Sequence, residues 1–326
     1  MNGSSSHIVG LSRTIPRQLP TEIADDTLCE ISLLLNLRRA VNMSMYKDNY
    51  VKRRIAIRMR STSCENADHY CHILRSSEEE LDLLERYMPV PVLDKEALKR
   101  DYDELGQDGI MRGFVWGDQG GCWQHAACLM GTEELIMAAA DKPDWVLSLL
   151  EALWRKKERF IEESLSGAAY DLVETGGGAA SSTVISPKYF DKFCLPFDRK
   201  MHDALHATGH KAVYHTCGGM MPILERVVAN GCDASETLTP PEMGGDARPR
   251  ELKRRIGAQV ALIGGLDQNT YLEEGDRESI SSHVHYLFET YGENGGYIMS
   301  PSDHFFHVPV ASLEAYAEAA KECVYK

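Results

Sequence analysis

The segment KAVYHTCGG, residues 211–219, joins an apolar run to two potential metal ligands and two glycines. Residues 211–214 have the length and apolar character of a buried strand, and His215 and Cys217 follow at its end. Because side chains alternate faces along a strand, residues two apart project the same way and can reach one ion. The glycines then allow the backbone to turn. We therefore predict a strand, a turn and a helix, with a metal site where the strand ends.

The same alternation recurs from about residue 110 onward, where short apolar runs that end in polar or glycine residues precede segments of helical period. This pattern is typical of repeated βαβ units in a parallel sheet. The expected strands cover residues 113–117, 170–174, 211–214, 234–238, 260–263 and 297–299.

Several helix boundaries are legible in the sequence. Ser186-Pro187 pairs an N-cap residue with a proline at the first helical position, and Pro143 opens a helix expected to run to about residue 166. A further helix is expected over residues 220–229, and Gly209 and Gly231 lie where helices should end.

The polar residues at the strand ends favour a closed barrel over an open doubly wound sheet. In a (β/α)8 barrel the carboxyl ends of all strands converge on one mouth, whereas in an open sheet they spread along an edge. We therefore predict an α/β fold, a (β/α)8 TIM-type barrel with an N-terminal helical or hairpin extension. The residues expected at its mouth are Asp118, Glu174, His215, Cys217, Glu236, Asp267, Asp303 and His304.

The first hundred residues differ from the rest of the chain. A helix is expected over residues 26–42, an edge hairpin over 53–60 and an acidic helix near 77–87. We predict that residues 1–105 supply an N-terminal extension or cap together with the early barrel elements. Residues 106–326 then form the main barrel with the metal site, and residues 1–326 form a single domain, a size that barrels commonly reach.

Composition narrows the classes of function. With 43% hydrophobic and 26% charged residues the chain is an ordinary globular protein, and its formal net charge of -14 disfavours a nucleic-acid partner. The first thirty residues lack a secretory signal and no apolar run is long enough to span a membrane, so we expect a cytoplasmic protein. Nine cysteines, irregularly spaced, fit reduced thiols better than a disulfide framework.

An imidazole and a thiolate on one ion indicate zinc, and a catalytic zinc needs a third protein ligand and one open position. His-x-Cys alone is a weak signal, because a hydrogen-bonded core histidine beside a small apolar cysteine is common. The third ligand must come from another strand end. Asp303 and His304 in SPSDHFF are the first choice, and Glu236 is the second.

Three longer segments carry a resemblance to a known family. YHTCGGMMPILERVVANGCDASETLTPP at residues 214–241, LIGGLD at 262–267 and GGYIMSPSDHFFHVP at 295–309 resemble the uroporphyrinogen decarboxylase superfamily, and within it the corrinoid-dependent methyltransferases. The similarity covers roughly residues 110–320. It implies a (β/α)8 barrel with zinc held by a His-x-Cys pair and a later cysteine. His215 and Cys217 match the pair, whereas Asp303 stands where the later cysteine is found.

The resemblance implies a function. We expect a zinc-dependent methyltransferase that moves a methyl group between a small molecule, an O-methylated donor by preference, and the cobalt of a corrinoid carried on a partner protein. If Asp303 provides an oxygen ligand, the zinc is better suited to polarising an oxygen substituent of the substrate as a Lewis acid than to activating a substrate thiol. The expected cofactors are zinc and the partner's corrinoid (cobalamin). A homodimer is left open, and no membrane partner is expected.

Two other functions stay open. Tetrapyrrole decarboxylases of the superfamily resemble one another in an arginine-rich N-terminal segment and a late Asn-Leu-Gly-His stretch, and this sequence has neither. A non-catalytic barrel that only binds metal or a corrinoid protein is the third possibility. Metal content and methyl transfer separate the three.

The remaining candidates surround the proposed metal. Glu174, Glu236 and Asp267 are assigned to catalysis as groups that bind substrate, orient a ligand or transfer a proton, although each could equally cap a helix or lie on the surface. Four further residues are assigned to the substrate-binding wall: Trp116, Asp118, Trp123 and Tyr214. The glycine-rich residues 176–182 lack the lysine and spacing of a phosphate loop, and the spacing of Cys64, His69, Cys71 and His72 matches no common zinc finger.

Overall fold

The structure is a computed structural model that describes residues 31, 88–117 and 119–325. Residues 91–326 form one compact unit, and residues 9–90 fall outside it. The elements predicted for residues 26–42, 53–60 and 77–87 therefore lie outside the described residues, apart from Ile31, which is helical. Among the described residues, no helix combines the length and hydropathy needed to span a lipid bilayer.

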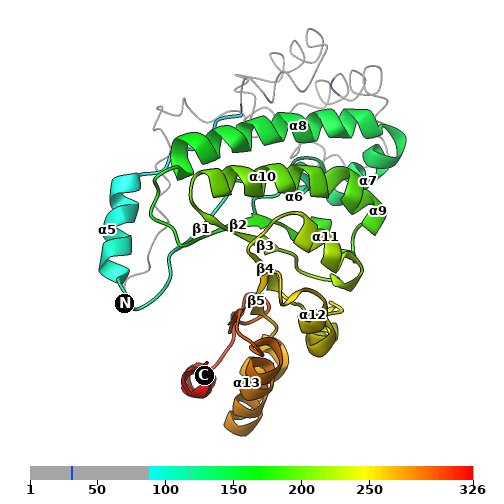
Figure 1. Ribbon diagram of the computed structural model, residues 1–326. Coiled ribbons are helices and arrows are strands. Elements are labelled where there is room, and N and C mark those ends of the chain that lie inside the picture. Colours follow the sequence, from blue (N-terminus) through cyan, green and yellow to red (C-terminus); the bar gives the residue numbers. More distant parts are fainter. Residues whose placement is uncertain (1–30, 32–87, 118, 326) are drawn as a thin grey trace. The chain divides into compact units, whose positions relative to one another are not determined.

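A parallel sheet organises the compact unit, with its six described strands in chain order (Figure 1). Every predicted strand is confirmed, with ends that differ from the prediction by a few residues at most. The strands are β1 Arg112–Phe114, β2 Leu172–Gly176, β3 Lys211–His215, β4 Ala234–Thr237, β5 Ala261–Gly264 and β6 Tyr297–Ile298.

The strand order is that of a barrel wall, because each strand pairs with the next one along the chain. The α/β class and the parallel pairing are thus confirmed. A closed eight-stranded barrel is not: within the described residues, β1 and β6 each pair with one neighbouring strand and not with each other.

Helices and short helical turns connect the strands. The α-helices are α5 Lys95–Leu105, α6 Cys122–Met130, α7 Thr132–Asp141, α8 Pro143–Phe160, α9 Pro187–Tyr189, α10 Leu195–Ala207, α11 Leu224–Ala229, α12 Pro249–Ile256, α13 Arg277–Tyr291 and α14 Val310–Glu322. The 3-10 turns are η3 Gly178–Ala180, η5 Met221–Ile223 and η6 Pro241–Met243, and the π-helical segments are η2 Ile161–Leu165, η4 Phe190–Cys194 and η7 Gln268–Glu273.

The predicted helix signals are confirmed. The Ser186 hydroxyl accepts a hydrogen bond from the Tyr189 backbone N–H at 3.3 Å, as an N-cap should, and Pro143 opens α8. Gly209 and Gly231 follow helix ends with φ of 87° and 86°, in the left-handed region that favours glycine. The helix predicted over residues 220–229 begins as the turn η5 and continues as α11.

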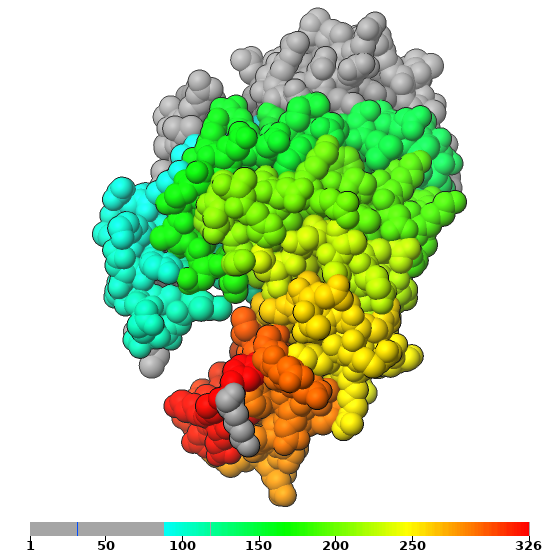
Figure 2. Space-filling view, in the orientation of Figure 1, coloured from blue at the N-terminus to red at the C-terminus, as the bar shows by residue number. Residues whose placement is uncertain are grey.

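Helices cover one face of the sheet in two tiers (Figure 1). α10 packs on β2 and β3, and α8 packs on α10. Farther along the chain, α13 and α14 pack against each other, in orange and red in Figure 2. The opposite face carries an apolar cluster of Val213, Ala234 and Ile263 from three adjacent strands. Alternate strand residues therefore point to α10 or to the face that bears the predicted site.

Polar pairs lie buried between α10 and the sheet. The Tyr214 hydroxyl donates to Asp198 Oδ2 at 2.9 Å, and the Thr175 hydroxyl lies 2.7 Å from His202 Nε2. Burial raises the pKa of Asp198 to about 7, although the hydrogen bond from Tyr214 opposes the shift. Burial likewise lowers the pKa of His202 to about 4, so this imidazole is neutral at physiological pH.

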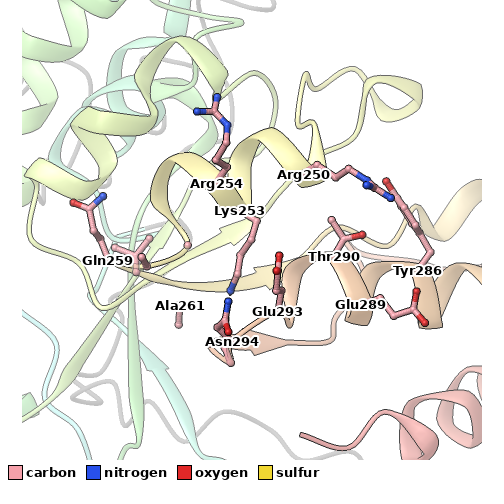
Figure 3. A pocket seen from close by; sticks show the side chains of 15 residues that line it. Arg250, Lys253, Arg254, Gln259, Ala261, Tyr286, Glu289, Thr290, Glu293 and Asn294 are labelled. Atoms are coloured by element: carbon pink, nitrogen blue, oxygen red, sulfur yellow. The ribbon is translucent and has the colours of Figure 1, made fainter. Parts of the chain in front are cut away.

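An open cavity of about 970 Å³ lies at the other end of the strands, between α12 and α13 (Figure 3). Lys253 extends across it toward Asn294 and donates to the Gly295 carbonyl at 2.8 Å, whereas Arg254 points away. The cavity is lined at the start of β5 by Val260 and Ala261. It is therefore remote from the carboxyl ends of the strands, where barrel enzymes place their chemistry.

The buried Asp198 gives a prediction for the pH dependence of stability. Its folded pKa is raised above the unfolded value, so its contribution is fully present below about pH 4 and is lost as pH rises through about 7. Asp198→Asn should remove this dependence. Relative to the variant, the wild type should lose on the order of 4 kcal/mol of unfolding free energy across that range.

Urea unfolding at several pH values measures the difference. Asp203→Asn, at an exposed position on the same helix, is the matched control and should follow the wild type. Parallel pH profiles for the wild type and Asp198→Asn would show that the carboxyl is not perturbed.

Candidate metal centre

The strand register brings three predicted residues together. His215 on β3 pairs with Glu236 on β4, and Glu174 on β2 pairs with Val213, two residues before His215 on the same face. All three therefore point away from α10, toward the face where the parallel strands end. Their side chains are largely buried, with exposed fractions of 18% for Glu174, 13% for His215 and 7% for Glu236.

A hydrogen bond fixes the orientation of the His215 ring. Nδ1 lies 2.7 Å from Glu236 Oε1 and 3.5 Å from Glu174 Oε1. Because an ionised carboxylate can only accept, Nδ1 carries the hydrogen and donates it to Glu236. The ring is thus held with Nε2 directed the other way, toward the residues after β1 and β2.

Arg112 neutralises the two carboxylates. Its Nη2 donates to Glu174 Oε2 at 2.7 Å and also to Glu236 Oε1, which therefore receives hydrogen bonds from both Arg112 and His215. Two buried carboxylates so close would otherwise repel each other. Sequence reasoning missed Arg112, because it placed the first strand one residue later and looked for chemistry at strand ends.

The pKa shifts follow from this arrangement. Burial and the charge of Glu236 raise the pKa of Glu174, while Arg112 and His215 oppose the rise. Burial also acts to raise the pKa of Glu236, but hydrogen bonds from His215 and Arg112 outweigh it, so this pKa is lowered. Glu236 is therefore the anionic partner, and Glu174 is the carboxyl better able to hold a proton.

Opposing interactions act on the pKa of the His215 ring. Burial acts to lower its pKa, but the hydrogen bonds with Cys217 and Glu236 and the charges of both glutamates outweigh it, so the pKa is raised. The Cys217 side chain thus lies within hydrogen-bonding reach of the ring. The two residues of the His-x-Cys motif therefore lie near each other at the end of β3, and their joint binding of a metal stays a prediction.

Gln119 is a second neighbour that sequence reasoning missed. Its Nε2 lies 3.0 Å from His215 Nε2, and its Oε1 accepts a hydrogen bond from the Gly178 backbone N–H at 3.0 Å. The residue lies in the loop between β1 and α6, with a φ of 50°. A glutamine in a loop carries no sequence signal that would distinguish it from a solvated side chain.

The donors around His215 allow a metal ion at either ring nitrogen. Ligand atoms of Glu174, His215 and Glu236 lie within 4.8 Å of one another, so this triad could hold a cation. However, the Arg112 guanidinium already occupies both carboxylates, and the 2.7 Å contact is a hydrogen bond. A carboxylate on the far nitrogen of a ligating histidine is a common outer-shell arrangement. Nε2 and the neighbouring Cys217 are the remaining pair of donors, of the kinds zinc prefers.

The candidates for the third ligand lie elsewhere. Asp303 and His304 are exposed after β6 and are not part of the cluster of ligand atoms found among the described residues. The Asp303 backbone N–H donates to Gln268 Oε1 at 3.3 Å, and Gln268 Nε2 donates to the His304 carbonyl at 3.3 Å. Gln268 thus holds this loop against η7.

Two predicted roles are corrected by position. Tyr214 is fully buried and bonded to Asp198 on the α10 side of the sheet, so it cannot line the substrate wall. The alternation of strand side chains explains the error, because the neighbour of an inward-facing His215 must face outward. Asp267 is 3% exposed and caps η7, accepting from the Thr270 backbone N–H at 3.0 Å and from its hydroxyl at 2.7 Å.

The two tryptophans predicted for the substrate wall, Trp123 and Trp116, make contacts within the protein. Trp123 is buried and donates from Nε1 to the Ala179 carbonyl at 3.0 Å, which anchors the turn after β2. Trp116 is half-buried, and its ring meets that of His125 edge-on at 5.1 Å. The fourth predicted wall residue, Asp118, lies outside the described residues.

Gly176 sets the distance between β2 and β3 at the site. Its φ is 88°, and a Cβ added there would lie 2.5 Å from the His215 carbonyl oxygen and 2.9 Å from Tyr214 Cε2. The next residue, Gly177, donates from its backbone N–H to the same carbonyl at 2.9 Å. A side chain at residue 176 would therefore push away the strand end that carries His215.

Gly176→Ala should destabilise the protein far more than Gly209→Ala. Both residues have φ near 90°, but a Cβ at Gly209 meets nothing within 4 Å. Backbone strain alone should cost Gly209→Ala about 1–2 kcal/mol, and overpacking should bring Gly176→Ala to about 3–5 kcal/mol. Chemical denaturation measures both, and equal losses would show that the close approach of β2 to β3 is unimportant.

Comparisons with known proteins complete the description of the site. A family model described as uroporphyrinogen decarboxylase (URO-D) matches residues 77–323, and one described as CheR methyltransferase, all-alpha domain, matches residues 26–88. Among solved structures, a methyltransferase from Methanosarcina mazei aligns with a TM-score of 0.59 and 19% identity. The alignment covers 70% of this chain and 63% of that chain. At this identity the likeness shows the fold. No curated protein matches the sequence.

Proposed function

The chain belongs to the uroporphyrinogen decarboxylase family, and from this premise we propose that it is a zinc-dependent methyltransferase. It would transfer a methyl group between a small molecule and the cobalt of a corrinoid carried on a partner protein. The observation that carries the proposal is the hydrogen bond from His215 Nδ1 to Glu236, which leaves Nε2 as the ring nitrogen that can bind a metal together with Cys217.

His215 and Cys217 would hold the ion, and Glu236 with Arg112 would keep the imidazole in the ligating orientation. The third ligand is proposed at the end of β6, at Asp303 or His304. The chemistry that zinc supplies in such a site is Lewis-acid polarisation of the heteroatom that loses the methyl group. One thiol and otherwise nitrogen and oxygen donors make a harder site, which favours an oxygen substituent on the donor.

Glu174 would supply the proton that the leaving oxygen of the methyl donor needs. Loss of the methyl group from an O-methylated donor to the partner's corrinoid would break the C–O bond and leave its electron pair on the oxygen. The oxygen then needs a proton to leave as a hydroxyl group. The raised pKa of Glu174 suits a carboxyl that carries this proton, and its place beside Glu236 and Arg112 keeps it near the metal ligands.

The same residues weigh against tetrapyrrole decarboxylation. A decarboxylase of this family would need cations to bind propionate groups. Among the described residues, Arg112 contacts this cluster, and it is already bound to two carboxylates. A guanidinium that is already paired with two carboxylates gains little by exchanging them for a third. The network of Arg112, Glu174 and Glu236 is therefore better suited to holding His215 in place than to binding an acidic substrate.

Methyl transfer tests the proposal directly. The full chain should form methylcobalamin from a reduced corrinoid protein and at least one member of a panel of methoxylated small molecules. Cys217→Ala should abolish the reaction, because one of the ligands is lost. Cys128→Ala, at an exposed position on α6, is the matched control and should retain it.

The spectral change of cobalamin on methylation provides the measurement. No methylcobalamin with any donor, together with release of carbon dioxide from a porphyrinogen, would contradict the proposal and favour the decarboxylase. Neither activity, with zinc still bound, would favour a non-catalytic barrel.

A further inference from the structure

The two nitrogens of His215 have different neighbours. Nδ1 donates to Glu236, which the Arg112 guanidinium holds in place. Nε2 faces the side-chain amide of Gln119 at 3.0 Å. Since Nδ1 is committed to a carboxylate, Nε2 is the nitrogen through which His215 can bind a metal, and Gln119 lies directly against it.

The backbone of Gly178 determines which end of the amide faces the ring. Its N–H needs an acceptor, and Gln119 Oε1 supplies one at 3.0 Å. The amide NH₂ group therefore points to His215 Nε2, 3.0 Å away. An amide NH₂ has hydrogens to donate but no lone pair suited to a cation, so in this orientation Gln119 cannot be a ligand.

The hydrogen-bonded pair of Gln119 and Gly178 also lies against Cys217, the second proposed metal ligand. Gly178, the residue that Gln119 bonds, lies so close to Cys217 that a Cβ at residue 178 would overlap Sγ. The Gln119 amide and the Gly178 backbone, joined by their hydrogen bond, therefore lie against the Nε2 and Sγ donors together.

We propose that Gln119 is a gate over the metal site: its amide lies against His215 Nε2 in the metal-free chain and must swing away before a metal ion binds through that nitrogen. The inference rests on the proposed function, because it takes His215 and Cys217 as the metal ligands. It assigns to Gln119 a role in metal selectivity and uptake that neither the family nor the sequence pattern indicates.

The position of Gln119 suits such a movement. It is half-buried and lies between Gly117 and Gly120, whose φ values of 96° and 83° leave the loop with glycine at both turning points. The movement costs two neutral hydrogen bonds, to His215 and to Gly178, whereas the rigid strand residues stay in place.

Cobalt(II) binding to the metal-free full chain tests the gate. Cobalt is a spectroscopic substitute for zinc, and a bond from a cysteine to cobalt gives an absorption band. Because Cys128 is exposed, the part of this band that is lost in Cys217→Ala reports occupation of the proposed site. Gln119→Ala should bind cobalt about fivefold to tenfold more tightly than the wild type and should take it up faster, because hydrogen bonds no longer oppose binding.

Gln124→Ala is the matched control. Gln124 Oε1 accepts from the Ala179 backbone N–H at 2.8 Å, so it anchors the same turn through the residue after Gly178. The control should bind cobalt as the wild type does. If cobalt uptake is faster than in the wild type in both Gln119→Ala and Gln124→Ala, and equally fast in the two, then general loosening of the turn controls access and the gate does not.

The outcomes separate the two proposals. If the wild type binds cobalt through Cys217 and Gln119→Ala binds it equally or more weakly, the gate is wrong and the proposed metal site stands. Binding by Gln119→Ala alone would support a gate that is firmly closed. If neither protein shows the sulfur-to-cobalt band at saturating cobalt, both the gate and the zinc-dependent function are wrong.

Discussion

The hydrogen bond from His215 Nδ1 to Glu236 is the interaction on which the arrangement of the site depends. It decides which face of the imidazole is available, and it does so because β3 and β4 are paired with His215 directly opposite Glu236. Glu236 in turn needs a cation to stay ionised while buried, and Arg112 reaches it across β2 from the first described strand. Residues from four adjacent strands thus fix one ring.

The position of the glycines supports the same geometry. Gly176 and Gly177 let the end of β2 approach the His215 backbone, and Gly178 presents its N–H to Gln119 and its missing side chain to Cys217. The run that resembles a phosphate loop in the sequence therefore has a steric role. It allows two strand ends and a loop to meet at the candidate metal site without a side chain between them.

Much of the fold and part of the site could be predicted from the sequence. The remaining site residues could not, for identifiable physical reasons. Strand positions and the meeting of Glu174, His215 and Glu236 follow from apolar runs and period-two alternation, which are local properties. Arg112 and Gln119 could not be identified, because their roles come from strand pairing and loop conformation between residues far apart in the chain. Tyr214 was misassigned by ignoring alternation. Asp267 could not be distinguished from a capping residue, and capping is the contact it makes in the structure.

The central claim is that one histidine and one cysteine hold zinc, with oxygen or nitrogen completing the site. X-ray absorption at the zinc edge, on the zinc-loaded full chain, tests it most directly. The account predicts a single sulfur neighbour at about 2.3 Å with the remaining nitrogen and oxygen neighbours at about 2.0–2.1 Å, and loss of the sulfur in Cys217→Ala. Two sulfur neighbours, a zinc without sulfur, or a chain that retains no zinc would contradict it.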